Sequence, residues 1–222
     1  MKPIIIACVV AGLAIFLWII GRITLALQFF SVTNSANLPT LRPGGFFFTS
    51  NLVKPKRFKY LCYRAVTPDE GPTIRTHRLC GLPRDTIEIK AGILYVNGQN
   101  EDKNLSLMHL YKINKKDTFG IIYDRKLSYT IPPYSDTVYA LLEDKYVQRF
   151  RLPCVRYILP PGVRDEAIYR QYKKNWNRDN FGPLRVPAGK LFVLADNREN
   201  TEDSRYVGFI AQSKYVGAIL WK

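Results

Sequence analysis

Three short segments carry the residue types that perform nucleophilic and acid–base chemistry. Residues 35–45 (SANLPTLRPGG) supply a serine, residues 77–85 (HRLCGLPRD) a histidine, and residues 195–210 (ADNRENTEDSRYVGFI) several carboxylates and arginines. A serine hydroxyl is a weak nucleophile until a neighbouring base takes its proton. Histidine has an unperturbed pKa of ~6.5, so it can accept a proton near neutral pH without a large pKa shift. If the fold brings these segments together, they could support acyl transfer.

The cysteines do not suggest metal chemistry. Cys8, Cys62, Cys80 and Cys154 form no CxxC pair, and no group of histidines accompanies them. Structural zinc sites need closely spaced sulfur and nitrogen ligands. We therefore expect neither a metal nor an organic cofactor.

Strands are the elements that must position these residues. Val, Ile, Tyr, Phe and Thr are frequent, which favours β structure. Residues 31–45 are rich in Ser, Thr, Asn, Pro and Gly and are typical of turn and loop. The pattern predicts strands at 44–53, 57–66, 73–81, 85–90, 93–98, 190–195 and 215–221, with a turn between the second and third of them.

Residues 100–186 differ from the rest of the chain. They hold scattered charges, the pairs Pro132-Pro133 and Pro160-Pro161, and two possible helices near 136–149 and 164–177. We interpret them as an inserted α+β lobe. The predicted division is an anchor at 1–22, a β-rich core made of 23–99 and 187–222, and the lobe at 100–186. The fold class is mainly antiparallel β with this inserted lobe.

The amino terminus contains a long uncharged segment. Residues 3–20 (PIIIACVVAGLAIFLWII) would span about 27 Å as a helix, close to the thickness of a bilayer core. A cleaved signal peptide would have a shorter apolar run and a small-residue exit, which GRITLALQFF does not provide. We therefore expect a retained, single-pass transmembrane helix, and Lys2 favours a cytoplasmic amino end.

The chain is strongly basic, with a formal net charge of +15. The charges are spread along the sequence, and no signature of a nucleic-acid-binding module accompanies them. Beside a hydrophobic anchor, attraction to anionic lipid headgroups is the simpler explanation. The expected partner is thus a lipid bilayer and not a nucleic acid.

The three segments together, in this order behind an apolar anchor, resemble those of the type I signal peptidase family. That family places a serine three residues before a Pro-Thr pair, a basic residue and Arg before Gly-Leu-Pro-x-Asp, and a Gly-Asp-Asn-Arg…Ser-x-Asp-Ser-Arg…Gly box. The resemblance covers about 35–96 and 179–221. It implies a β-rich catalytic domain and a serine endopeptidase that removes signal peptides from exported preproteins at small-x-small sites.

The resemblance fails at the nucleophile. The family position, three residues before Pro39, is Ala36, which has no nucleophilic atom. Ser35 is one residue earlier, and a bulge or turn could rotate it into place as a displaced nucleophile. The alternative is that Ser35 is an ordinary loop hydroxyl. Asn34 stands where the family has a hydroxyl donor to the oxyanion, and its amide could donate instead.

The resemblance assigns the general base to His77, where bacterial members have Lys and the endoplasmic-reticulum branch has His. The alternative is a strand histidine with a structural hydrogen bond. Thr201 occupies the place of the hydroxyl that orients the base. Asp203 could orient His77 as a third triad member, or it could form an ion pair with an arginine.

The remaining matched residues suggest structural roles. Pro39, Asp196, Arg198 and Arg205 are expected to brace turns, the last three through ion pairs. His109, in the inserted lobe, is expected to be a surface or packing residue. Cys62 and Cys80 would lie nearly opposite each other if 57–66 pairs with 73–81. They could then form a disulfide in an oxidising compartment, or they could remain reduced, buried thiols.

Three functional hypotheses follow. The first is a signal peptidase that uses Ser35, His77 and Thr201 or Asp203. The second is a catalytically inactive family member that binds extended peptides or partner proteins at the membrane. The third, a basic membrane protein that binds lipid or nucleic acid, has only the charge to support it. The bacterial form of the third segment implies a plasma membrane, with the bulk domain on its outer, extracytoplasmic side. The sequence does not indicate an oligomeric state.

Overall fold

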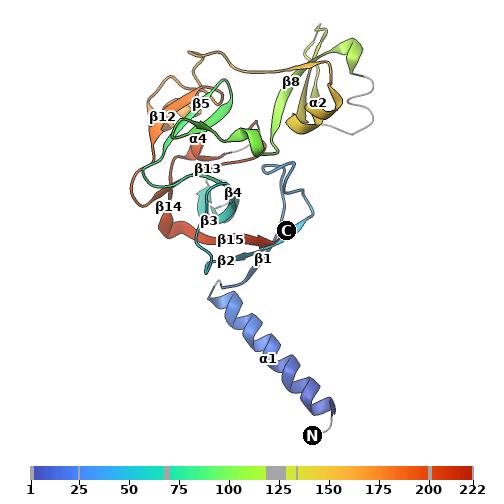
Figure 1. The fold of residues 1–222 in the computed structure, drawn as a ribbon, viewed down its shortest axis with the longest axis vertical. Helices are drawn as coiled ribbons and strands as arrows, with labels where there is room; N and C mark the ends of the chain where they lie inside the picture. The colour runs from blue at the N-terminus through green and yellow to red at the C-terminus, as the bar shows by residue number, and fades with distance from the viewer. Residues whose placement is uncertain are drawn as a thin grey trace.

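An isolated apolar helix leads into a β-rich domain. The structure, a computed structural model, describes residues 3–24, 26–67, 71–118, 129–133, 135–199 and 202–221. Helix α1, Pro3–Ile23, projects away from the rest of the molecule and has no buried residues (Figure 1). It is long and apolar enough to cross a membrane. An uncharged run of this length explains why the segment is a helix that nothing in the domain covers.

The domain consists of antiparallel sheets. A seven-stranded sheet has the order β1-β2-β15-β3-β4-β13-β14, and two four-stranded sheets have the orders β11-β8-β10-β9 and β12-β5-β6-β7. The strands are β1 Gln28–Ser31, β2 Phe46–Ser50, β3 Tyr60–Thr67, β4 Gly71–Gly81, β5 Thr86–Lys90, β6 Ile93–Val96, β7 Gln99–Asn100, β8 Met108–Asn114, β9 Tyr129–Thr130, β10 Thr137–Glu143, β11 Cys154–Arg156, β12 Phe181–Arg185, β13 Lys190–Leu194, β14 Ile210–Ala211 and β15 Tyr215–Trp221. The helices after α1 are η1 Asp102–Asn104, η2 Lys115–Asp117, α2 Asp144–Phe150, α3 Glu166–Tyr172, α4 Ser204–Val207 and η4 Gln212–Lys214.

The strands expected in the core are confirmed, and one expected helix is wrong. Residues 137–143 form strand β10, and only 144–150 are helical, where a helix was expected over 136–149. In β10 every second residue is buried, namely Val138, Ala140 and Leu142. This period of two is typical of a half-buried strand and not of a helix. The helix expected near 164–177 is confirmed as the shorter α3.

The central strands of the large sheet are buried on both faces. In β13, Leu191 and Val193 pack into one apolar cluster with Leu61. Phe192 and Leu194 pack into a second cluster on the other face. Successive side chains of a strand point to opposite faces, so one strand serves both clusters. Leu79 and Cys80 of β4 pack into the same two clusters, so β4 and β13 are held in place on both faces and can position the side chains that they carry.

Strand β4 has a partner along only part of one edge. Strand β3 pairs with β4 over its whole length, whereas β13 pairs only with residues 78–81 of β4. Among the described residues, 71–77 of β4 therefore have a strand neighbour on one side only. Unpaired backbone groups on such an edge can pair with another extended chain.

The region expected to be an inserted lobe contains its own sheet. Strands β8 and β10, with helix α2, form a part of the molecule beside the sheet that contains β5 and β12 (Figure 1). Strand β12, at the end of the same region, pairs with β5 of the expected core. The division into anchor, core and lobe remains a prediction.

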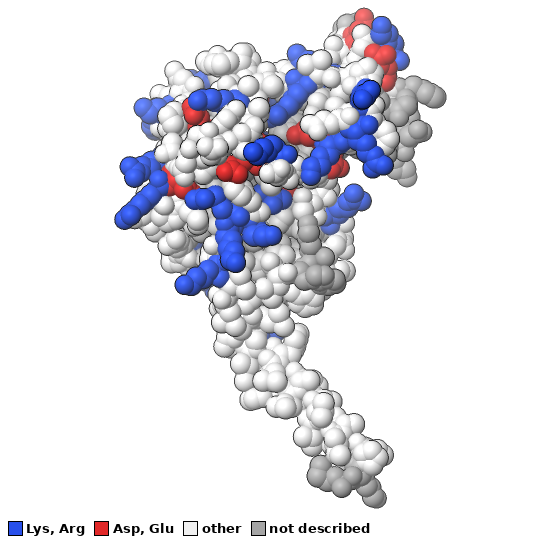
Figure 2. Space-filling view, viewed as in Figure 1, with Lys and Arg blue, Asp and Glu red and all other residues white. Residues whose placement is uncertain are grey.

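Charge is distributed unevenly between helix and domain. Figure 2 shows lysine and arginine side chains gathered on the visible face of the domain, while the visible surface of the helix below it is uncharged over most of its length. Residues 1–23 contribute only Lys2 and Arg22, so 13 of the 15 net positive charges belong to the part of the chain beyond the helix.

Candidate active site

His77 lies at the buried end of a pocket. It is carried by β4 and is 4% exposed, and its Nδ1 lies 2.9 Å from the hydroxyl of Tyr63 on β3. Burial in an apolar environment disfavours the imidazolium form and lowers the pKa of His77 to about 4, although the nearby Asp203 carboxylate acts in the opposite direction. His77 is therefore neutral near pH 7, the form in which an imidazole can accept a proton.

The loop that carries Ser35 and Ala36 is attached to the same strand. Asn37 donates from Nδ2 to the carbonyl of Thr76, the residue before His77, at 2.7 Å. The backbone amide of Asn197 donates to the carbonyl of Ala36 at 2.9 Å. These bonds fix the loop between β4 and the segment that follows β13.

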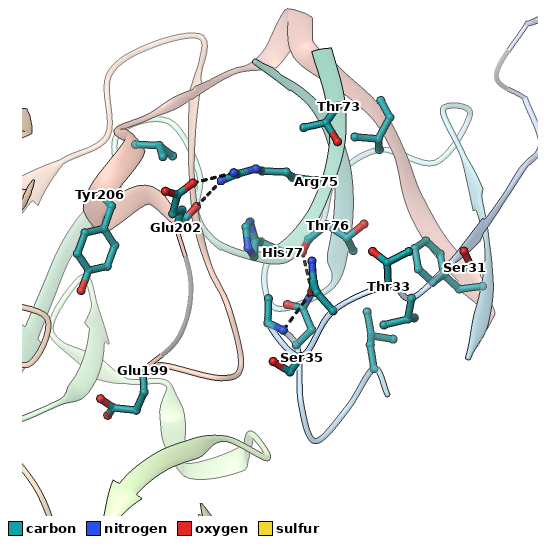
Figure 3. Close-up of a pocket in the computed structure, with 18 of the residues that line it drawn as sticks. Ser31, Thr33, Ser35, Thr73, Arg75, Thr76, His77, Glu199, Glu202 and Tyr206 are labelled. Carbon is teal, nitrogen blue, oxygen red and sulfur yellow. Dashed lines mark hydrogen bonds and ion pairs between the residues drawn. The ribbon is translucent and has the colours of Figure 1, made fainter. Parts of the chain in front are cut away.

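Ser35, Ala36 and His77 line one pocket of about 860 Å³, together with the open edge of β4. Figure 3 shows His77 and Arg75 on β4, with Ser35 on the neighbouring loop. Among the hydrogen bonds of the described residues, none joins the Ser35 hydroxyl to His77. The carbonyl of Ser35 accepts from the Leu38 amide at 3.2 Å, which makes a turn at this point. The structure thus brings candidate nucleophile and base to one pocket, and the described residues show no hydrogen bond between the two side chains.

The side-chain oxygen of Asn34 already accepts a hydrogen bond within the loop. Its Oδ1 accepts a hydrogen bond from the backbone amide of Ala36 at 3.1 Å. The side-chain NH₂ group is the part of Asn34 that can donate to a ligand. This bond also occupies the backbone amide at position 36.

The third segment forms a buried network of ion pairs. Asp203 is fully buried and accepts from Nε and Nη2 of Arg205 at 3.0 and 2.8 Å. It also accepts from the amide of Ala195, and the guanidinium of Arg205 holds the pKa of Asp203 below its usual range despite burial. Thr201 lies outside the described residues.

A second buried ion pair lies under the loop. Asp196 accepts from Nε of Arg78 at 2.6 Å and from the hydroxyl of Thr40 at 2.8 Å, and the Tyr60 hydroxyl also donates to it. Thr40 directly follows Pro39, whose peptide bond with Leu38 is cis. The Asp196–Arg78 pair thereby joins the loop to the residue after His77.

Arg198 connects the third segment to a different sheet. Its Nη1 and Nη2 donate to the carboxylate of Asp102, in η1, at 2.9 and 2.5 Å. Arg198 is 4% exposed, so this pair is buried. His109 is buried, with Nδ1 2.8 Å from Asp144, so it is a packing residue and not a surface residue.

The expectation that Cys62 and Cys80 lie opposite each other is wrong. Strands β3 and β4 do pair, but their register places Cys62 opposite Thr76 and Tyr60 opposite Arg78. Both cysteines are free and buried, and the sulfur of Cys62 lies 3.1 Å from the hydroxyl of Thr76. Among the described residues, no group of His, Cys, Asp and Glu is arranged to hold a metal.

Comparison with known proteins decides the family. The sequence model described as Signal peptidase, peptidase S26, matches residues 2–221. The chain belongs to the signal peptidase family. Relatives include signal peptidase I of Aquifex aeolicus, 26% identical over 86% of this chain and 73% of the relative. Signal peptidase I of Bacillus caldolyticus is 26% identical over 96% of this chain and 82% of the relative.

A solved structure is also similar to the chain. A signal peptidase I from Enterococcus faecalis shares 22% sequence identity and covers 75% of this chain and 97% of its own, with a TM-score of 0.36. Membership of the signal peptidase family itself rests on the sequence match. It makes the chain a member of a family of membrane-anchored serine peptidases that remove signal peptides.

Several residues around the signal peptidase pocket were not singled out in the sequence. Asn37 and Tyr63 contact the active-site elements directly, and Arg75 forms an ion pair with Glu202 across the pocket. Asn37 lies within the 35–45 segment and Glu202 within the 195–210 segment. The spacing of residues in these segments does not predict that Asn37 bonds to Thr76 or that Glu202 pairs with Arg75. Arg75 precedes His77 by two residues, and strand alternation alone indicates that it shares the face of His77.

Proposed function

We propose that this protein is an active signal peptidase that cleaves exported preproteins after small-x-small motifs, with Ser35 as nucleophile and His77 as general base. The observation that carries the proposal is the meeting of neutral His77, the Ser35 loop and the open edge of β4 in one pocket. An extended peptide that pairs with this edge would pass between the loop and His77.

The pocket walls suit small apolar side chains. Leu41 and Phe47 line it and are each 3% exposed, and Val32 and Ile74 complete an apolar wall. These side chains would contact alanine-sized residues of a bound peptide, which supports the small-x-small preference. The NH₂ group of Asn34 would stabilise the oxyanion.

A second function has one specific observation in its favour. Ala36 occupies the family nucleophile position, and its amide is taken by Asn34. A family member that binds extended peptides at the membrane without cutting them would retain the edge of β4 and the loop but need no serine at position 36.

Cleavage of a purified precursor by the full chain in liposomes separates the two functions. Ser35→Ala and His77→Ala should each reduce the rate by at least about a hundredfold, because Ser35 would form the acyl bond and His77 would accept the proton that the serine hydroxyl loses. Ser213→Ala, an exposed serine outside the pocket, should leave the rate unchanged. Product mass over time is the measurement.

An Ala36→Ser variant completes the design, because it restores the family nucleophile. Cleavage by Ala36→Ser but not by wild type would replace the first proposal with the peptide-binding one. Cleavage by wild type that persists in Ser35→Ala would end the assignment of Ser35.

A further inference from the structure

An ion pair closes the pocket beside His77. Arg75 donates from Nη2 to the side-chain Oε2 of Glu202 at 2.7 Å and from Nη1 to the backbone carbonyl of Glu202 at 3.2 Å. Figure 3 shows the Arg75 side chain reaching from β4 to Glu202 on the opposite wall. Because Arg75 and His77 are two residues apart on one strand, both side chains face the same side of β4.

The two partners differ in how firmly they are held. The side chain of Arg75 is 21% exposed, whereas that of Glu202 is 65% exposed. An ion pair with so exposed a partner contributes little to stability. An incoming peptide would therefore displace the Glu202 carboxylate and not the guanidinium, which keeps its bond to the backbone carbonyl. After that displacement, a mostly buried cation would remain in the pocket and would require an anion.

Where the structure describes the pocket and its surroundings, the other acidic side chains are already paired. The Glu199 carboxylate forms an ion pair with Arg178, with Oε2 2.8 Å from Nε, and Asp203 is paired with Arg205. His77 is neutral and supplies no positive charge. Arg75 is thus the cation that a bound ligand would meet.

We propose that Arg75 is a specificity-determining residue that binds a carboxylate of the extended peptide, in exchange for Glu202, about two residues from the bond that His77 faces. The position follows from the spacing of Arg75 and His77, which corresponds to roughly 7 Å along a strand. An acidic side chain or a free C-terminal carboxylate could both supply the anion, and a lysine at the same place would be repelled. This inference rests on the proposed binding of peptides to the edge of β4.

Peptide binding to the full chain in detergent micelles tests the inference without requiring cleavage. The protein carries Ser35→Ala so that peptides stay intact. The probes are fluorescein-labelled, C-terminally amidated peptides that share one Ala-x-Ala motif. They carry Asp, Asn or Lys two residues after the second alanine. A further probe has the Asn sequence with a free carboxylate. Fluorescence anisotropy gives each Kd.

The Asp peptide should bind about five- to tenfold more tightly than its Asn counterpart, because a charge-assisted pair replaces a neutral contact. Arg75→Gln should abolish this ratio, Arg75→Lys should retain part of it, and Glu202→Gln should tighten binding of the Asp peptide. Arg64→Gln is the matched control. Arg64 is exposed on β3 and does not line the pocket. Tighter binding of only the free-carboxylate probe would assign the C-terminal source.

An equal Asp-to-Asn ratio in wild type and Arg75→Gln, with both proteins equally stable to heat, would overturn the assignment of Arg75 while leaving peptide binding intact. Failure of every peptide to bind would instead remove the proposed peptide site itself, and the role of Arg75 with it. Precursor cleavage by the wild-type chain is measured in parallel. Cleavage with an unchanged Asp-to-Asn ratio would remove only the role of Arg75, whereas neither cleavage nor binding would remove the proposed function as well.

Discussion

His77 acquires its character from burial. A solvent-exposed histidine is partly protonated near pH 6.5, but His77 is nearly inaccessible and its pKa is lowered to about 4. A bacterial lysine base would need a far larger shift to be neutral at the same pH. Histidine at this position therefore supplies a neutral base at little cost in desolvation.

We predict that His77 remains neutral down to about pH 4. In the folded state its pKa lies below the unfolded value of ~6.5, so the unfolded chain binds more protons between these limits. The free energy of unfolding should therefore fall as the pH drops from about 6.5 to about 4. NMR of the imidazole carbons gives the titration directly, because the chain has only two histidines. His109→Gln assigns the signals. A His77 midpoint near 6.5 would contradict the burial argument.

Individual residues show how much of the site the sequence could predict. Ser35, Ala36 and His77 were placed by motif spacing, and the structure puts all three at one pocket. The Arg75–Glu202 pair joins residues 127 positions apart, and no local pattern encodes such a contact. The sequence allows Asp203 either to orient His77 or to form an ion pair with an arginine, and the structure shows its carboxylate bound by Arg205. Its effect on His77 is exerted through charge.

Among the elements, strands with alternating burial or dense β-branched residues were predictable. The sequence pattern does not separate strand β10 from helix α2, because Leu141, Leu142 and Glu143 lead without a break into the helix. The register of β3 and β4 was missed because it depends on the turn between them, and a shift of a few residues moves Cys80 away from Cys62. Registers of this kind are set by contacts that the sequence pattern does not specify.

The link between η1 and the third segment should be essential for stability. Asp102→Asn leaves the guanidinium of Arg198 buried without its counter-charge, which typically costs about 3–5 kcal/mol. Glu88→Gln is the control. Lys90, the partner of Glu88, is 64% exposed, so loss of this ion pair should lower the free energy of unfolding by at most about 1 kcal/mol. Thermal unfolding of the purified full-length variants compares the two. Equal shifts would show that the Arg198 pair adds nothing beyond a surface contact.

The molecule as a whole is proposed to cross the plasma membrane once, with the domain on the outer side. Lys2 before the helix favours a cytoplasmic amino end. Protease added to intact spheroplasts should then degrade the domain, which is measured as loss of the signal from an antibody against the domain. Protection of the domain until the cells are lysed would place it in the cytoplasm.

The short connection between α1 and β1 sets how the protein would search for substrates. Only residues 24–27 separate the two elements, and Asn51 on the domain donates to the carbonyl of Thr24 at 2.8 Å. So few residues reach at most about 14 Å, which keeps the pocket at a nearly constant height above the lipid. A precursor that is itself held in the bilayer would then be met by lateral diffusion at a high effective concentration. The same cleavage motif carried by a dissolved protein would be encountered far less often.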